Sequence, residues 1–385
     1  MTPLLSRAAS FSLLAVACLT IMVGCVLVPG LPVIARALGV EQAASWLVTV
    51  PSLGVIVFGP LAGKLIERAG SYTALCLGLF CYGLLGVAGF LLHGGVSVFA
   101  DRLLLGGATA VIMAAGTGLI STFYEGQARL NMIARQGMSI ELGGVIFLFI
   151  GGLLASAGWQ WPFMLYLSAW VLLGLVLWLI PRPPRQHPDS ASSERASASG
   201  GLKIVFAIAA LSMLVFFTAV ILLPLQLHTL GVQEAGIGYF LSSVSLVAVG
   251  AAALMPRAVR KVGEHGTLIF ALVFYALAHL AFMNADGLTL MIEGGLCLGI
   301  GFGLSIPLAN HMTVEQSPAH QRGRHLAYLS MAIFAGQFVS SFMEFVSADR
   351  SRVFGAAAAL ALLGAALLSW HLRLIKNGGA VKQGT

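Results

Sequence analysis

Five ionisable side chains interrupt the apolar stretches of this sequence, and these are the residues most able to do chemistry. Asp101 and Arg102 are adjacent in one stretch, and Glu141, Glu293 and Glu344 lie in three others. A charged group inside a bilayer costs about 2.5–3.5 kcal/mol on insertion scales, so each is a functional candidate by default. A carboxylate can bind and release a proton, and an arginine can hold an anionic group. This set therefore gives candidates for proton binding or for contact with a polar ligand.

Other kinds of chemistry find little support in the residue pattern. The five cysteines lie inside apolar runs without CxxC or Cys/His spacing, and the nine histidines are scattered, so we expect neither disulfides nor a metal site. No nucleotide-binding motif of the GxxxxGKS type occurs. No nucleophile with an adjacent base is visible, so we expect no enzyme and no cofactor. Gln337 lies in the middle of an apolar run and is a further candidate for substrate contact.

The elements that position these residues are membrane spans. Charged residues make up 9% of the 385 residues and the mean hydropathy is +0.94, whereas soluble domains are about 25% charged. A helix needs about 20 apolar residues to cross a bilayer. Twelve such windows are present, near 11–32, 44–63, 72–93, 97–119, 138–157, 162–180, 204–227, 235–255, 266–284, 288–309, 325–347 and 353–372. The sequence predicts an all-α membrane protein with twelve transmembrane helices.

One polar segment divides the twelve spans into six and six. Pro181 to Gly201 is rich in Pro, Ser, Ala and Gly with scattered charge, and such a composition cannot bury enough apolar surface to fold. We therefore predict a six-helix bundle over 1–180, a flexible cytoplasmic linker over 181–202, a second bundle over 203–375 and a cytoplasmic tail over 376–385.

The basic residues set the orientation of the spans. All but four of the 21 Lys and Arg fall on one side of the twelve-span arrangement; Arg36, Arg350 and Arg352 fall on the other, and Arg102 lies within a span. Because cytoplasmic loops carry the Lys/Arg excess, both termini and the linker are predicted to be cytoplasmic. The net charge of +7 is thus a topology signal, and we expect no nucleic acid partner.

The two halves of the chain are related by an internal repeat. Pro32 followed by LGVEQA (Leu38–Ala43) returns as Pro224 followed by LGVQEA (Leu230–Ala235), at an offset of 192. Six spans are an even number, so the halves have the same orientation and are related by an axis along the membrane normal. A central cavity between the halves is the expected consequence.

Three motifs resemble the major facilitator superfamily, and the resemblance covers all twelve spans. The loop GKLIERAGSY (Gly63–Tyr72) is similar to its loop signature, with Glu67 where Asp is usual, and PRAVRKVG (Pro256–Gly263) is a degenerate second copy. DRLLLGGATA resembles the span-four pattern of the twelve-span drug:proton antiporter branch, as does GGVIFLFIGGLLASAGWQWPF for span five, although the glycine-proline pair of that branch is replaced. The resemblance implies a cytoplasmic latch formed by Gly63, Glu67, Arg68 and Gly70.

The resemblance also implies roles for the charged residues. Arg102 and Glu293 are separated by 191 positions, close to the repeat offset, and spans four and ten line the cavity in this family. Our hypothesis is that Glu293 carries the coupling proton, with Arg102 as its partner or as the anchor of an anionic substrate. The alternative is a static ion pair, or side chains that reach the outer surface. Glu141 is predicted nearer the cytoplasmic interface and Glu344 nearer the outer one.

The resemblance favours a proton-coupled exporter of amphipathic small molecules in a bacterial cytoplasmic membrane, acting as a monomer by alternating access. A few polar groups in apolar spans suit an amphipathic organic substrate better than a sugar. Export of one cellular metabolite, such as a siderophore, and uptake of a metabolite stay open. The rivals from other classes are a membrane enzyme, which lacks visible catalytic groups, and a sensor that keeps the fold without transport.

Overall fold

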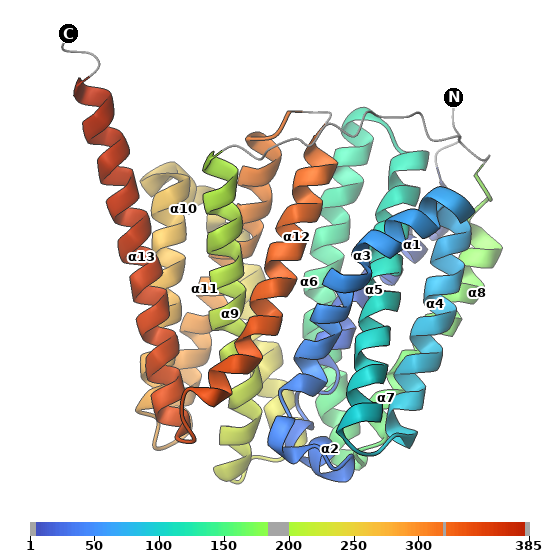
Figure 1. The fold of residues 1–385 in the computed structure, drawn as a ribbon, viewed down its shortest axis with the longest axis horizontal. Coiled ribbons are helices and arrows are strands. Elements are labelled where there is room, and N and C mark those ends of the chain that lie inside the picture. The colour runs from blue at the N-terminus through green and yellow to red at the C-terminus, as the bar shows by residue number, and fades with distance from the viewer. Residues whose placement is uncertain (1–4, 184–199, 319–320, 382–385) are drawn as a thin grey trace. The chain divides into compact units, whose positions relative to one another are not determined.

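The computed structural model describes residues 5–183, 200–318 and 321–381, and these residues are helical with no strand among them. Within each half of the chain the helices lie side by side (Figure 1). The elements of the first half are α1 (Arg7–Cys25), α2 (Leu31–Ala37), the short helix η1 (Glu41–Ala43), α3 (Trp46–Ala69), α4 (Ser71–Ala88), the short helix η2 (Gly89–Leu91), α5 (Gly95–Phe123), α6 (Gly126–Ala157), α7 (Trp161–Met164), the short helix η3 (Leu165–Leu167) and α8 (Ser168–Leu179). Those of the second half are α9 (Gly200–Thr229), α10 (Glu234–Met283), α11 (Leu288–Glu315), α12 (Arg322–Val339), η4 (Ser340–Phe345) and α13 (Arg350–Val381).

The predicted number of spans is confirmed for the described residues. Eleven helical stretches are long and apolar enough to cross a membrane. One of them, α10, has 50 residues and breaks at Gly263, where φ is 76° and ψ is 169°. Glycine adopts this left-handed region without the steric cost that a side chain imposes. The break divides α10 into two spans, which gives twelve.

Some boundaries differ from the predicted ones. The structure begins α6 at Gly126, where the hydropathy window predicts a span from 138. The additional turns contain polar residues that contact α5. Among them, the Gln136 side chain donates from Nε2 to the Thr117 hydroxyl of α5 at 3.2 Å. At the other end of the chain, α13 continues to Val381, into the segment predicted as a tail. Most of the predicted linker, 184–199, lies outside the described residues.

The residue contacts group the chain into two compact units. Unit 1 comprises Met1–Arg195 with Leu223–Ser242, and unit 2 comprises Ala196–Leu222 with Ser243–Thr385. A short segment from beyond the predicted linker therefore packs with the first six spans. Within unit 1, Gly152 of α6 and Gly238 of α10 are so close that a Cβ on Gly152 would lie 2.7 Å from the Gly238 Cα. Nearby, the Ser242 hydroxyl donates to the Val145 carbonyl at 3.2 Å.

The repeat is visible as equivalent backbone features in the two units. Gly70 and Gly263 both have positive φ, 81° and 76°. A Cβ on Gly106 would clash with the Pro51 carbonyl oxygen, and one on Gly299 would lie 2.5 Å from the Val244 carbonyl oxygen. Small residues let transmembrane backbones approach closely. Both pairs of glycines give an offset of 193 between the two halves.

In each unit, an arginine links the end of the fourth span to the start of the fifth, a contact region that we call the joint. Arg129 of α6 donates to the carbonyls of Ser121 and Tyr124 at the end of α5, at 2.8 and 2.9 Å. The equivalent Arg322 of α12 donates to two carbonyls at the end of α11, at 3.2 and 3.3 Å. The last carbonyls of a helix lack partners within the helix, and a cation also complements the helix dipole. Each arginine thus ties two consecutive spans together.

Candidate functional site

Arg102 is buried inside unit 1, where its own unit supplies its partners. The side chain is 1% exposed, and that of the neighbouring Asp101 is 5% exposed. The Arg102 Nη2 lies 3.4 Å from the Asp101 carboxylate, and Nη1 donates to the Tyr166 hydroxyl at 3.3 Å. The guanidinium also lies 5.4 Å from the Phe163 ring centroid and 5.7 Å from that of Tyr166. These cation–π contacts stabilise a buried arginine.

A glycine that directly follows α4 makes room for this arginine. A Cβ on Gly89 would clash with the Arg102 Nη2. The equivalent position in unit 2 is Phe282, whose ring packs over Gly294, the position equivalent to Asp101, so closely that a Cβ there would clash with the ring. The two units therefore fill equivalent interior positions in different ways. Unit 1 packs the Arg102 side chain against a glycine, and unit 2 packs the Phe282 ring against a glycine.

The register corrects the predicted equivalence of Arg102 and Glu293. At an offset of 193 the counterpart of Arg102 is Gly295, and Glu293 is the counterpart of Ala100. Two residues along a helix rotate a side chain by about 200°, so the two side chains occupy different faces of their helices. Arg102 is buried in its unit, whereas Glu293 is exposed near the start of α11.

Glu141 lies deeper in its helix than the sequence predicts. Because α6 runs from Gly126 to Ala157, Glu141 is at its middle and not near an end. Its side chain is half-buried, and no described residue forms an ion pair with it. With a period of 3.6 residues, Glu141 shares a face of α6 with Val145 and Gly152, which contact the start of α10. The acid thus lies about one helical turn beyond that contact.

The other candidates occupy different places. Gln337 of α12 is buried, next to Gly336, where a Cβ would clash with the carbonyl oxygen of Ala210 on α9. Glu344 is half-buried in η4, directly after the end of α12. The described residues include no group of three or more His, Cys, Asp or Glu able to hold a metal.

The residues of the predicted latch lie at the turn between α3 and α4. Gly70 ends α3 and precedes α4 with φ 81° and ψ 154°. Glu67 and Arg68 lie in the last turn of α3, and within the described part of the chain neither forms an ion pair. The tight turn at Gly70 is thus present.

Sequence reasoning missed the residues that hold Arg102. Tyr166 and Phe163 are far from Arg102 in the chain, and nothing in their own spacing marks them as its partners. Gly89 could have been found by comparing the halves at the correct offset, because its counterpart is a phenylalanine. The repeat motif gave an offset of 192, which is correct only before the second span, where Gly39 and Gly231 share a positive φ.

Comparisons with known proteins agree on the family. The sequence matches the family profile described as Major Facilitator Superfamily over residues 13–341, with a second match over 205–378. It is 25% identical over 307 residues to the uncharacterized transporter YycB of Bacillus subtilis, a match that covers 75% of this chain and 73% of that protein. It is 27% identical over 185 residues to multidrug resistance protein 1 of the same organism, covering 47% of this chain and 46% of the relative.

Solved structures share the fold at low sequence identity. A bacterial homologue of the human lysosomal transporter Spinster, in an inward-facing and occupied conformation, aligns with a TM-score of 0.78 at 15% identity, covering 94% of this chain and 96% of that one. A D-xylose–proton symporter aligns with a TM-score of 0.72 at 18% identity, covering 94% and 95%. At these identities the likeness shows the fold alone.

Proposed function

This chain belongs to the Major Facilitator Superfamily, a family of multi-pass membrane transporters and not of enzymes, and from that premise we propose that it exports amphipathic small molecules in exchange for protons. The two six-span halves would alternate access to the substrate between the two sides of the membrane. The topology signal in the basic residues supports cytoplasmic termini, and the bacterial relatives support a place in the cytoplasmic membrane. The relative named multidrug resistance protein 1 supports a drug-type substrate.

The observation that carries this proposal is the position of Glu141. Glu141 lies within the span Asn131–Ala157 of α6, and acids inside a span, which cost about 3 kcal/mol at the bilayer centre, mark proton relays and substrate pathways. Glu141 has no ion-pair partner among the described residues to hold it charged. Low-polarity surroundings favour the neutral form of an acid, and water or a cationic substrate favours the charged form. A change of surroundings during transport would therefore make Glu141 bind one proton and later release it.

Asp101 and Arg102 suit a supporting role better. Their side chains are almost fully buried and pair with each other, and Arg102 also donates to Tyr166. A substrate would have to open the interior of unit 1 to reach them. Glu293 is the second candidate acid, because it is exposed on an apolar helix, close to the start of α11 at Leu288. Gln337 and Glu344 are the remaining candidates for substrate contact.

Purified protein in liposomes with an imposed pH gradient tests the proposal. Proton flux is measured on adding lipophilic cations, neutral drugs and carboxylate siderophores, for the wild type, Glu141→Gln and Glu293→Gln. We expect Glu141→Gln to lower substrate-driven proton flux at least tenfold and Glu293→Gln to lower it less. Glu41→Gln, which removes an exposed carboxylate 3.2 Å from Arg36, is the matched control and should leave flux unchanged.

The outcomes separate the alternatives. Flux with several unrelated drugs supports drug-type efflux, and flux with one chemical class supports a dedicated exporter. Substrate-driven flux that survives Glu141→Gln but not Glu293→Gln moves the proton site to α11. Flux that survives both substitutions, or substrate movement that is independent of the pH gradient, overturns proton coupling through these acids.

A further inference from the structure

We propose that His325 is a proton-binding site that fastens the joint between α11 and α12 when neutral and releases it when protonated. His325 lies in the first turn of α12 and is 2% exposed. Its Nδ1 lies 2.7 Å from the hydroxyl of Ser317, just beyond the end of α11. This contact joins the same two helices as the Arg322 hydrogen bonds.

The direction of these hydrogen bonds assigns the tautomer of the ring. The Ser317 hydroxyl donates to the Thr313 carbonyl of α11 at 2.5 Å. A hydroxyl has one proton to donate, so the His325 Nδ1 must carry the hydrogen of its bond to Ser317. Neutral imidazole has one N–H, which leaves Nε2 as a bare acceptor. That nitrogen is buried and has no hydrogen-bond partner, so it is the atom that would take up the proton.

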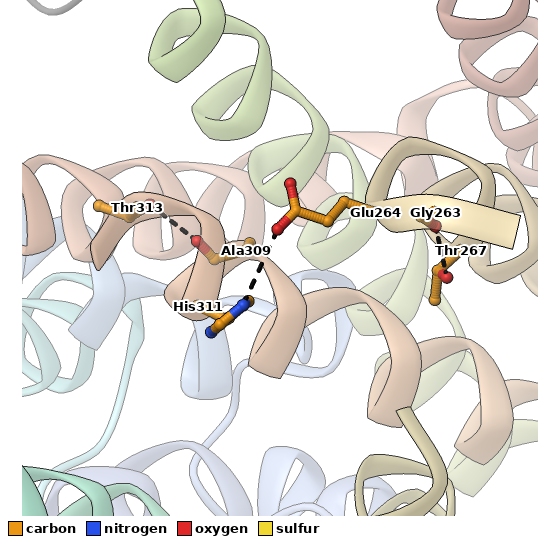
Figure 2. A network of polar contacts seen from close by, with 6 residues as sticks. All are labelled: Gly263, Glu264, Thr267, Ala309, His311 and Thr313. Carbon is orange, nitrogen blue, oxygen red and sulfur yellow. Dashed lines mark hydrogen bonds and ion pairs between the residues drawn. The ribbon is translucent and has the colours of Figure 1, made fainter. Parts of the chain in front are cut away.

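Protonation of the ring would give it a second N–H without an acceptor in this arrangement. A buried N–H without a partner costs free energy, and Arg322, which is in the same turn of α12, already places a positive charge on the last carbonyls of α11. Other charged or titratable side chains near this end of the helices include Tyr328 on α12, whose ring centroid lies 6.4 Å from that of His325, Arg324 on α12, Glu315 on α11 and the Glu264–His311 pair. That pair joins α10 to α11 at 3.8 Å (Figure 2), so Glu264 already has a partner. Protonation of His325 therefore costs least when its ring leaves the buried position.

The first half of the chain has no such group at the equivalent place. At the offset of 193, the counterpart of His325 is Met132, and that of Ser317 is Tyr124. Met132 is buried like His325, and Arg129 makes the same carbonyl contacts as Arg322. The joint thus holds in unit 1 without a histidine. What His325 adds in unit 2 is a response to pH, at the end that the topology signal assigns to the cytoplasm.

Hydrogen exchange of the whole protein in nanodiscs tests this inference without any transport assay, so its failure is separate from failure of the proposed function. Amide exchange in the last turn of α11 and the first turn of α12 is measured across the mildly acidic to neutral range and corrected for the intrinsic exchange rate. Release linked to one proton should raise the open population up to about tenfold per pH unit on acidification. In His325→Asn this dependence should be lost, because the amide can still donate to Ser317 but does not titrate.

Two more variants keep the test decisive if His325→Asn folds poorly. His325→Met installs the residue that unit 1 uses at this place and should also give exchange independent of pH. His311→Gln removes the neighbouring histidine and should keep the wild-type dependence. A wild-type slope equal to that of both His325 variants overturns the inference, as does a slope that disappears in His311→Gln.

Discussion

Removal of the Arg102 side chain should destabilise unit 1 far more than loss of any exposed ion pair. Arg102→Leu leaves the Asp101 carboxylate 5% exposed and without its cation, and it also removes the Tyr166 hydrogen bond. Breaking a buried pair by deleting one partner costs about 3–5 kcal/mol. For a unit of this size about 2–4 °C of melting temperature corresponds to about 1 kcal/mol, so we expect a loss of roughly 6–20 °C.

Removing both charges tests the cause of that loss. In Asp101→Asn/Arg102→Leu no uncompensated charge stays buried, so the double variant should recover at least half of the lost melting temperature. Arg352→Leu is the matched control, because its ion pair with Asp349 is 3.7 Å long and exposed, and such pairs contribute about 0–1 kcal/mol. The assay is thermal unfolding of detergent-solubilised protein, followed by tryptophan fluorescence and by loss of monodisperse protein.

Two results would refute this reasoning. If Arg102→Leu melts within about 2 °C of Arg352→Leu, the two variants differ by less than about 1 kcal/mol. The buried pair then does not hold unit 1 together. If the double variant is as unstable as Arg102→Leu, the loss comes from packing against Phe163 and Tyr166 and not from a stranded carboxylate.

Two further predictions follow from the helix contacts. Gly152→Val places side-chain atoms where the Gly238 backbone lies. In a background without the native cysteines, it should therefore raise maleimide labelling of the Ser242→Cys variant several-fold. Gly137→Val, whose Cβ meets open space, should not. Arg129→Gln removes two hydrogen bonds to helix-end carbonyls and should cost about 1–3 kcal/mol, seen as a lower melting temperature that Arg129→Lys restores in part; equal melting of all three proteins would count against the joint.

The sequence alone determined the architecture, because each of its signals is local. The number of spans depends on the length of apolar runs. The orientation, which stays a prediction, depends on where Lys and Arg lie along the chain. The loop at Gly70 was predictable from a glycine at a chain turn, and the structure gives it the expected positive φ. The bilayer acts on each segment separately, so short windows carry this information.

The tertiary structure decided where each charged residue points and what it contacts. Hydropathy could not show that α6 begins at Gly126, because its first turns are polar and are held by contacts to α5, and this start is what puts Glu141 at mid-helix. Nor could spacing show that Arg102 turns into unit 1, since Gly89 makes the room and Tyr166 and Phe163 supply the contacts. A register error of two residues rotates a helical side chain by about 200°. The role of a buried charge therefore depends on packing between helices, which the order of residues along one helix does not contain.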